Sequence, residues 1–201
     1  MKKIVLASRN EGKLVEMQAL LAPLNFDLRP VSEFTDDAPE EAAPTFIENA
    51  LLKARHAALV SGLPAVADDS GIEVDALERA PGVRSARYSG ASANDSANNQ
   101  KLLRELKGIP DDRRGARYWC VMVYLRDAED ATPLIAQAQW RGMIAHNPRG
   151  ANGFGYDPLF YVAEFKCTAA ELDPAAKNKV SHRGKAAKHL YSLIHDAGIH
   201  G

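Results

Sequence analysis

The stretch KKIVLASRNEGKLVEMQALL, residues 2–21, decides the fold class, because it has the pattern of a strand, a turn and a helix in succession. Residues 4–7 are a short apolar run with β-branched side chains, and after the turn apolar side chains recur at helical spacing. The first turn of a helix exposes unpaired backbone N–H groups and a partial positive charge. We therefore predict that this turn binds an anion such as a polyphosphate, with Ser8, Asn10 and Lys13 converging on it.

The common nucleotide-binding fingerprints do not explain this turn. The P-loop pattern GxxxxGK[ST] is absent, and the glycines of Gly150–Gly155 have the reverse of the GxGxxG spacing. An ordinary capped helix start would also account for residues 8–13. From these residues alone, both interpretations stay open.

Extended and helical patterns alternate along the rest of the chain. Thr45 and Glu48 have the spacing of a capping box, which predicts a helix over about 45–60. Small polar residues over 89–99 predict a loop that leads into a helix reaching Leu106, and apolar spacing predicts a last helix over 182–195. Further strands are expected, with Ser70-Gly71 as the turn between the second and third of them: 26–31, 64–69, 72–77, 118–125, 134–144 and 159–162.

This order of elements predicts an α/β protein, a mixed sheet with flanking helices and some antiparallel pairing in its middle. Because no internal repeat and no linker between independent halves is evident, residues 1–201 are expected to form a single domain.

The composition narrows the class of partner. The 201 residues carry a net charge of −1 without a long basic run, so we expect neither a nucleic-acid polymer nor an anionic membrane as partner. Two cysteines imply neither a disulfide framework nor a zinc site and fit a reducing cytoplasm. No run of about 18 apolar residues occurs. We expect a soluble, cytoplasmic protein that acts on a small molecule.

The segment Ala67-Asp68-Asp69-Ser70-Gly71 carries the sharpest chemical signal. Two carboxylates at the end of an apolar strand are poorly explained by packing, because an uncompensated buried charge is costly. Successive strand residues point to opposite faces, so only one of Asp68 and Asp69 can face a given cleft while the other pairs elsewhere. A carboxylate there is suited to bind Mg²⁺ or to accept a proton from water. The alternative is that both aspartates serve only as turn residues.

Two further segments supply groups for the same chemistry. The acidic loop around Glu40 and Glu41 offers a second oxygen ligand for a hard cation that shares substrate phosphates, although a solvated acidic face would look the same. Lys53 lies one helical turn after Asn49 and is placed to reach a phosphate; without this context it would be interpreted as an exposed helix lysine.

The segments Gly153-Phe154-Gly155-Tyr156-Asp157-Pro158 and Ser181-His182-Arg183-Gly184 have the composition of a pocket for a base. Glycines let the backbone approach a flat ligand closely, and the rings of Phe154 and Tyr156 are available for stacking. Donors for carbonyl or phosphate oxygens come from Lys177, His182 and Arg183. Taken alone, the two aromatic residues would be assigned to the core.

Six segments in chain order resemble one family, the noncanonical purine nucleoside triphosphate pyrophosphatases, that is, the dITP/XTP or inosine-triphosphate pyrophosphatases. They are Ser8-x-Asn10-x-x-Lys13, Thr45-Phe46-x-Glu48-Asn49-Ala50-x-x-Lys53-Ala54, Ala67-Asp68-Asp69-Ser70-Gly71, Pro81-Gly82-x-x-Ser85-Ala86-Arg87-Tyr88-Ser89-Gly90, Gly153-Phe154-Gly155-Tyr156-Asp157-Pro158 and Lys177-Asn178-x-x-Ser181-His182-Arg183-Gly184. The match spans nearly the whole chain. It departs from the family pattern at Ala43 and Asn152, where glycines are usual.

The resemblance implies a mixed α/β fold with two lobes around a central nucleotide-binding cleft, usually a homodimer. It further implies Mg²⁺-dependent hydrolysis of ITP, dITP and XTP to the monophosphate and pyrophosphate. Asp69 would be the general base or a metal-bound carboxylate, with Glu40 as a metal ligand, although Glu41 next to it competes for that role. The substrate contacts that the resemblance implies are Ser8, Arg9, Asn10, Glu11, Gly12, Lys13, Lys53, Ser70, Phe154, Gly155, Tyr156, Asp157, Lys177, His182 and Arg183.

Within this set, Phe154 would stack on the purine. Arg183 and the backbone N–H groups near Ser181 would donate to its 6-oxo oxygen, because a site built around a hydrogen bond discriminates strongly. The alternative roles for Arg183 are phosphate binding and bracing of the last helix. Two other functions remain: a pyrophosphatase for another nucleotide class, such as modified pyrimidines, and a non-catalytic nucleotide sensor. The sensor has no need for paired carboxylates beside an acidic loop, which favours an enzyme.

Overall fold

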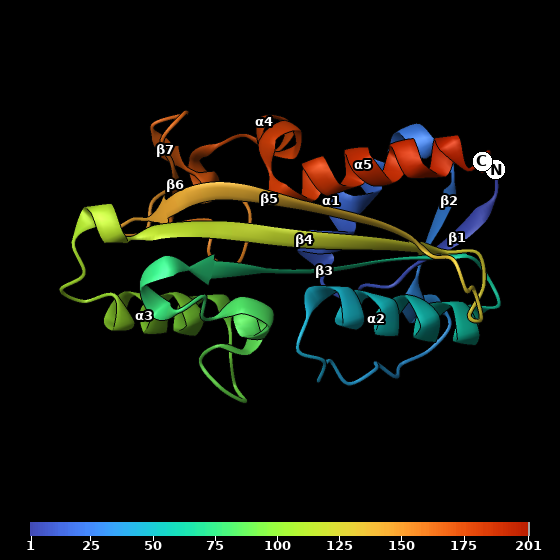
Figure 1. The fold of residues 1–201 in the computed structure, drawn as a ribbon, viewed down its shortest axis with the longest axis horizontal. Helices are drawn as coiled ribbons and strands as arrows, with labels where there is room; N and C mark the ends of the chain where they lie inside the picture. The colour runs from blue at the N-terminus through green and yellow to red at the C-terminus, as the bar shows by residue number, and fades with distance from the viewer. Residues whose placement is uncertain (201) are drawn as a thin grey trace. The chain divides into compact units, whose positions relative to one another are not determined.

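A computed structural model describes residues 1–200 and contains a mixed α/β architecture (Figure 1). The strands of this part form one sheet in the order β2-β1-β3-β4-β5-β6-β7. Strand β1 pairs in parallel with β2 and β3, whereas β6 pairs antiparallel with β5 and β7. The predicted fold class, a mixed sheet with flanking helices, is thereby confirmed. The strands are β1 Lys3–Leu6, β2 Asp27–Pro30, β3 Ala65–Val74, β4 Gly115–Leu125, β5 Leu134–Ile144, β6 Phe160–Val162 and β7 Cys167–Thr168; the α-helices are α1 Glu11–Leu21, α2 Phe46–Ser61, α3 Asp95–Glu105, α4 Pro174–Val180 and α5 His182–Asp196.

The described chain divides into two compact units. Unit 1 comprises residues 1–69, 120–138 and the chain from Arg183 onward. Unit 2 comprises residues 70–119 and 139–182. The prediction that residues 1–201 form a single domain stays a prediction.

Unit 1 is a three-layer arrangement of helices on both faces of its strands. On one face, α1 and α5 pack on alternate strand residues such as Ile4 and Met122, and on the other face α2 packs on the intervening ones such as Val5 and Val123 (Figure 1). The period-two alternation of a strand makes this possible, because it sends neighbouring apolar side chains into different layers. Consecutive polar residues at a strand end are therefore also sent to different faces.

Unit 2 packs α3 and the segment after β5 around a second core. Leu102 and Leu106 of the α3 region contact a cluster of aromatic residues that includes Tyr118, Trp140 and Phe160. Tyr156 belongs to this core, with 4% of its surface exposed, and its hydroxyl donates to the Ser85 carbonyl at 2.8 Å. Its ring was expected to be available for stacking on a base, and that expectation was wrong, because the ring fills core volume.

Many element boundaries follow the sequence signals, but helix α3 begins at Asp95, within the expected loop, helix α4 was not expected, and the region of Ser70-Gly71 differs. The helix predicted over 45–60 is α2, capped by Thr45, whose side chain accepts from the Glu48 backbone N–H. The two strands expected around Ser70-Gly71 are instead the single strand β3. Flanking residues on both sides of Ser70 are buried, and Gly71 does not have a positive φ, so nothing there requires a turn.

Candidate active site

The first turn of α1 is organised by side chains of the preceding turn. Asn10 is the N-cap and accepts from the Lys13 backbone N–H at 2.9 Å, while the Ser8 hydroxyl accepts from the Asn10 N–H at 3.3 Å. Glu11 and Gly12 are the first two residues of the helix. The exposed Arg9 instead contacts the loop that follows β2, where its guanidinium donates to the carbonyls of Thr35 at 2.6 Å and Asp37 at 2.9 Å. The positive end of the α1 dipole therefore lies at the turn that contains Asn10 and Lys13.

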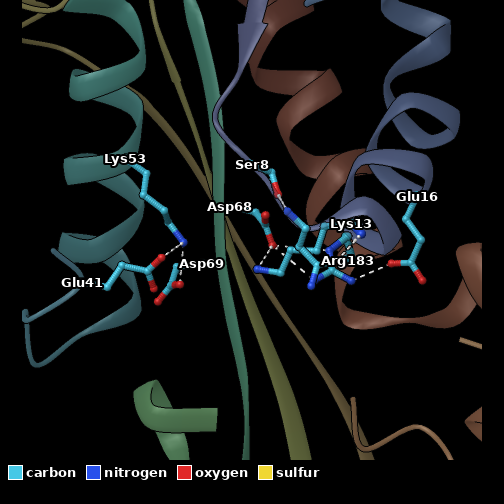
Figure 2. A network of polar contacts seen from close by, with 9 residues as sticks. Ser8, Lys13, Glu16, Glu41, Lys53, Asp68, Asp69 and Arg183 are labelled. Carbon is cyan, nitrogen blue, oxygen red and sulfur yellow. Dashed lines mark hydrogen bonds and ion pairs between the residues drawn. The ribbon is translucent and has the colours of Figure 1, made fainter. Parts of the chain in front are cut away.

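Asp68 joins two cations on the α1 and α5 face of β3. Lys13 Nζ lies 3.2 Å and Arg183 Nη2 lies 3.3 Å from Asp68 Oδ2, and Arg183 also donates to Glu16 at 2.6 Å (Figure 2). The side chains of Asp68 and Arg183 are almost completely buried. Sequence reasoning missed Glu16, although it lies three residues after Lys13 and so shares its helix face.

These contacts keep the network charged although it is buried. Burial alone would raise the Asp68 pKa, but the positive charges of Lys13, Arg183 and Lys53 hold this pKa well below the ordinary value of 3.8. Burial likewise opposes the Arg183 charge, and the Asp68 and Glu16 carboxylates nevertheless raise the pKa of its guanidinium. Asp68 therefore fixes two cations whose positive charge suits phosphate or carbonyl oxygens.

Asp69, the next residue, faces the other side of β3. Lys53 of α2 donates to Asp69 Oδ1 at 2.7 Å and lies 3.6 Å from Glu41, so two carboxylates share one ammonium group (Figure 2). Figure 2 shows the two aspartates on opposite sides of the β3 ribbon, as the alternation of a strand predicts. The expectation that Asp68 and Asp69 serve different faces is confirmed.

Protonation of this second cluster is set by burial and charge together. Burial raises the pKa of Asp69 above the ordinary carboxyl value, although Lys53 opposes that shift and Glu41 adds to it. For Lys53, burial favours the neutral amine, and the carboxylates of Asp69, Asp68 and Glu41 outweigh it, so its pKa is raised. A carboxylate with a raised pKa is a better proton acceptor, and a lysine with a raised pKa remains a cation.

The loop before α2 places Glu41 by means of Asn49. The completely buried Asn49 accepts from the Ala43 N–H at 3.1 Å and donates to the Ala43 carbonyl at 3.2 Å. This pair of hydrogen bonds fixes the backbone two residues after Glu41. Glu40, the expected metal ligand, is exposed, and it is Glu41 that reaches Lys53.

We tested whether these residues suit Mg²⁺. No group of three or more His, Cys, Asp or Glu side chains gathers within residues 1–200 in a way that could hold a metal ion. Mg²⁺ nevertheless commonly uses one or two carboxylates together with water and substrate phosphates. Asp69 and Glu41 already converge on one cation, Lys53, and their oxygens match this preference. The donor set fits a magnesium ion that is bound together with a phosphorylated substrate.

In unit 2, Asp157 organises the loop Gly153-Phe154-Gly155. One carboxylate oxygen, Oδ2, accepts from the Phe154 N–H at 3.0 Å and from Lys177 Nζ at 2.7 Å. A Cβ on Gly153 would lie 2.1 Å from the same oxygen, and Gly153 also has a φ of +74°. The loop therefore requires glycine at position 153. The Asp157 carboxylate, with 2% of the residue's surface exposed, is buried and accepts hydrogen bonds from the Phe154 N–H and the Lys177 ammonium.

Aromatic and cationic groups surround that loop. The Lys177 ammonium lies 5.1 Å from the centroid of the half-buried Phe154 ring, a cation–π distance. His182, with 3% of its surface exposed, stacks on Tyr118 with centroids 4.5 Å apart and an interplanar angle of 6°. These contacts bring Phe154, Asp157 and Lys177 together in unit 2 and place His182 on the core aromatics.

The predicted site residues therefore fall into three groups. Unit 1 contains the Lys13, Asp68 and Arg183 network and, on the other face of β3, the Lys53 and Asp69 pair. Ser70 follows them in β3 and is half-buried. Unit 2 contains Phe154, Asp157 and Lys177. The roles expected for these residues stay predictions.

Comparisons with known proteins agree with this chemistry. Residues 4–193 match the model of a family described as the Ham1 family. The chain is 54% identical to the "dITP/XTP pyrophosphatase" of Photorhabdus laumondii over 98% of this chain and 100% of that protein, and 54% identical to the one of Escherichia coli O157:H7 over 96% and 98%. Among solved structures, it is similar to a HAM1 protein from Coxiella burnetii, with a TM-score of 0.89, 49% identity and coverage of 98% of this chain and 100% of that chain.

Proposed function

The chain belongs to the Ham1 family, and from this premise we propose that it hydrolyses the noncanonical purine nucleoside triphosphates ITP, dITP and XTP to the monophosphate and pyrophosphate. The observation that carries the proposal is the arrangement around Asp68 and Asp69 in the middle of β3. Asp68 holds two cations on one face, while Asp69 meets Lys53 and Glu41 on the other. A triphosphate needs cations for its charge and a carboxylate for the attacking water, and unit 1 has both.

We assign the triphosphate to the first turn of α1 and to two lysines, Lys13 and Lys53. The backbone N–H groups that follow Ser8 and Asn10 carry the positive end of the helix dipole. Lys13 and Lys53 add full charges, each already anchored on an aspartate. A lysine that is held in place before substrate binds loses less conformational entropy when it contacts a phosphate.

Asp69 acts as the general base in this proposal. Water attacks the α-phosphorus and its proton passes to the Asp69 carboxylate. A new P–O bond forms, the bond from the α-phosphorus to the bridging oxygen breaks, and pyrophosphate leaves. The raised Asp69 pKa favours its taking the proton, and the Lys53 ammonium counters the negative charge that develops on phosphate oxygens.

Asp69 and Glu41 are the residues that would hold Mg²⁺. When bound there, Mg²⁺ would neutralise charge on the phosphates and act as a Lewis acid. Asn49 supports this assignment, because its two hydrogen bonds to Ala43 restrict the loop that carries Glu41.

The base is assigned to unit 2. Phe154 offers a ring for stacking whose orientation is set by the loop, and Lys177 is held on Asp157. His182 and Arg183 complete the set that we propose to recognise the 6-oxo purine. The buried contact of Arg183 with Asp68 and Glu16 supports a second task for it, which is to hold Asp68 in place.

Product analysis tests the reaction directly. The protein is incubated with ITP and Mg²⁺, and the products are separated by anion-exchange chromatography. Equal amounts of IMP and pyrophosphate are expected. IDP with inorganic phosphate would instead identify a phosphatase, and unchanged ITP would leave only a binding function. Modified pyrimidine triphosphates in the same assay test the competing substrate class.

Metal dependence is tested in the same assay with a chelator. Excess EDTA is expected to abolish pyrophosphate release, and added Mg²⁺ to restore it, because the proposed ligands are all oxygens. Full activity in excess chelator would contradict the assignment of Asp69 and Glu41 as metal ligands.

We also propose that the protein is a homodimer of the cytoplasm. Both cysteines are free thiols, as expected in a reducing compartment. None of the helices within residues 1–200 is long and apolar enough to cross a bilayer.

The proposed homodimer is tested by light scattering, which is expected to give about twice the chain mass of 21.8 kDa. A mass equal to one chain at micromolar concentration would contradict the dimer.

A further inference from the structure

Side chains of helix α3 form hydrogen bonds with both the N–H and the carbonyl of Gly155, a residue in the loop that carries Phe154. Asp95, the first residue of the helix, accepts from the Gly155 N–H through Oδ2 at 2.6 Å. Asn99, one turn later, donates from Nδ2 to the Gly155 carbonyl at 2.8 Å. Residues four apart share one face of a helix, so α3 presents an acceptor and a donor side by side. We call this pair of hydrogen bonds the Gly155 clamp.

The clamp acts on the peptide group that directly follows Phe154. The Gly155 N–H belongs to the peptide bond between Phe154 and Gly155, so holding it restricts ψ of Phe154. The Phe154 N–H is held in turn by Asp157 at 3.0 Å, which restricts φ. With both flanking peptide groups fixed, the direction in which the Phe154 side chain leaves the backbone is fixed as well.

Gly155 needs such an external hold because of its own conformation. Its φ is +64°, in the left-handed region, and a Cβ there would meet nothing within 4 Å. Neighbouring side chains therefore do not confine the residue sterically, and glycine has the widest backbone freedom of any residue. The two hydrogen bonds from α3 supply the restriction that packing does not.

The orientation of the Asn99 amide carries an energetic cost. Nδ2 must face the Gly155 carbonyl, because only the amino group can donate. This leaves Asn99 Oδ1 buried and without a hydrogen-bond partner among the described residues. Buried acceptors of this kind are rare in native structures and call for an explanation. Asn99 is oriented for its donor, that is, for the hydrogen bond to the Gly155 carbonyl.

We propose that Asp95 and Asn99 are positioning residues for base recognition, which hold Gly155 so that the Phe154 ring is presented to the purine before substrate arrives. The inference rests on the proposed stacking of the base on Phe154. Neither residue contacts the phosphates in this proposal. Losing the clamp weakens binding of the base and leaves binding of pyrophosphate unchanged, whereas general loosening of the protein would weaken both.

Product inhibition separates these cases, because IMP carries the base and pyrophosphate does not. Inhibition constants for both are measured on the full chain with Mg²⁺ and ITP as substrate. Asp95→Ala and Asn99→Ala are each expected to raise the IMP inhibition constant about 5- to 30-fold, within the range that loss of base stacking produces, with an unchanged pyrophosphate constant. Asp95→Asn keeps an acceptor oxygen and is expected to restore most of the affinity for IMP. Gln100→Ala is the matched control, because Gln100 is an exposed α3 residue whose side chain donates to the Ser96 hydroxyl at 3.4 Å.

A double-mutant cycle with Phe154→Ala tests the route of the effect. If the clamp acts through the ring, Asp95→Ala raises the IMP constant in the wild-type background and has no further effect in Phe154→Ala. Additive effects, or equal changes for IMP and pyrophosphate, would overturn the inference. An unchanged IMP constant in Phe154→Ala would refute the stacking itself and the clamp's role with it. If Phe154→Ala changes the IMP inhibition constant but Asp95→Ala and Asn99→Ala do not, the clamp alone is refuted.

Discussion

At the residue scale, Asp69 is a carboxylate with 5% of its surface exposed that accepts from Lys53 at 2.7 Å. Asp69→Asn preserves its size and removes its ability to take a proton. We expect kcat to fall by about 10²- to 10⁴-fold, the usual contribution of a general base, with little change in nucleotide affinity. Steady-state kinetics with ITP check this, with the exposed Asp112→Asn as control. A variant that retains most of the wild-type turnover would remove Asp69 from the mechanism.

Asp68, its neighbour, is expected to matter for stability in a pH-dependent way. Its folded-state pKa lies below the ordinary value of 3.8, so the stability it contributes is present above that value and is lost as the pH falls through the folded-state pKa. Asp68→Asn leaves Lys13 and Arg183 without this carboxylate. Breaking a buried pair from one side costs about 3 to 5 kcal/mol at neutral pH.

Urea unfolding of both proteins between pH 7 and pH 3 measures this difference. The gap in unfolding free energy is expected to be widest at neutral pH and to narrow below about pH 4, because the Asp68 carboxyl of the unfolded chain then begins to protonate while that of the folded chain stays charged. A gap that stays constant over the whole range would mean that Asp68 stabilises the fold through packing rather than through charge.

At the scale of the elements, local signals predicted much of the fold. The capping residues Thr45 and Glu48 placed the start of α2 correctly, and the 134–144 pattern predicted β5 with both ends correct. Helix α4 was not predicted, because its seven residues give too little periodicity. Its N-cap Asp173 and first residue Pro174 are nevertheless typical of a helix start. The supposed turn at Ser70 failed because the burial of the flanking residues extends the strand.

The sequence predicted which residues belong to the candidate site, but it did not predict which of them contact one another. Alternation along β3 is a local rule and correctly separated Asp68 from Asp69. The partners of these residues come from elements far away in the sequence, such as Arg183 of α5 and Lys53 of α2. No local pattern encodes which helix packs on which face, so the pairing of Glu16 with Arg183 and of Glu41 with Lys53 could be found only in three dimensions.

The loop before α2 provides a prediction at this scale. Asn49→Ala removes both hydrogen bonds to Ala43 and leaves a cavity at a completely buried position. We expect a loss of about 1 to 3 kcal/mol in the free energy of unfolding and a higher Mg²⁺ concentration for half-maximal activity. Urea unfolding and a Mg²⁺ titration measure these. The matched control is the exposed Glu48→Gln, and an unchanged Mg²⁺ requirement in Asn49→Ala would separate this loop from the metal.

At the scale of the whole molecule, three strands contribute residues to both units. Strands β3, β4 and β5 each begin in one unit and end in the other. We therefore expect that the units unfold together, because melting one of them would break hydrogen-bonded strands of the other. Calorimetry is expected to show one transition with equal calorimetric and van't Hoff enthalpies. Two separated transitions would contradict the single-domain prediction.

Ligand binding provides the last prediction at this scale. The proposed ligand-binding residues are ordered only in the folded chain, so we expect a triphosphate to stabilise the folded state by mass action. In the inactive Asp69→Asn protein with Mg²⁺, ITP at about 100 times its dissociation constant contributes about 2.7 kcal/mol, which corresponds to a rise of about 5 to 10 °C in Tm. ATP at the same concentration is expected to raise Tm less, because its 6-amino group presents a donor where the site expects an acceptor. Adding Phe154→Ala is expected to reduce the shift with ITP, since the ring stacks on the base. Equal shifts with ITP and ATP would show that the protein does not select the 6-oxo purine at the binding step.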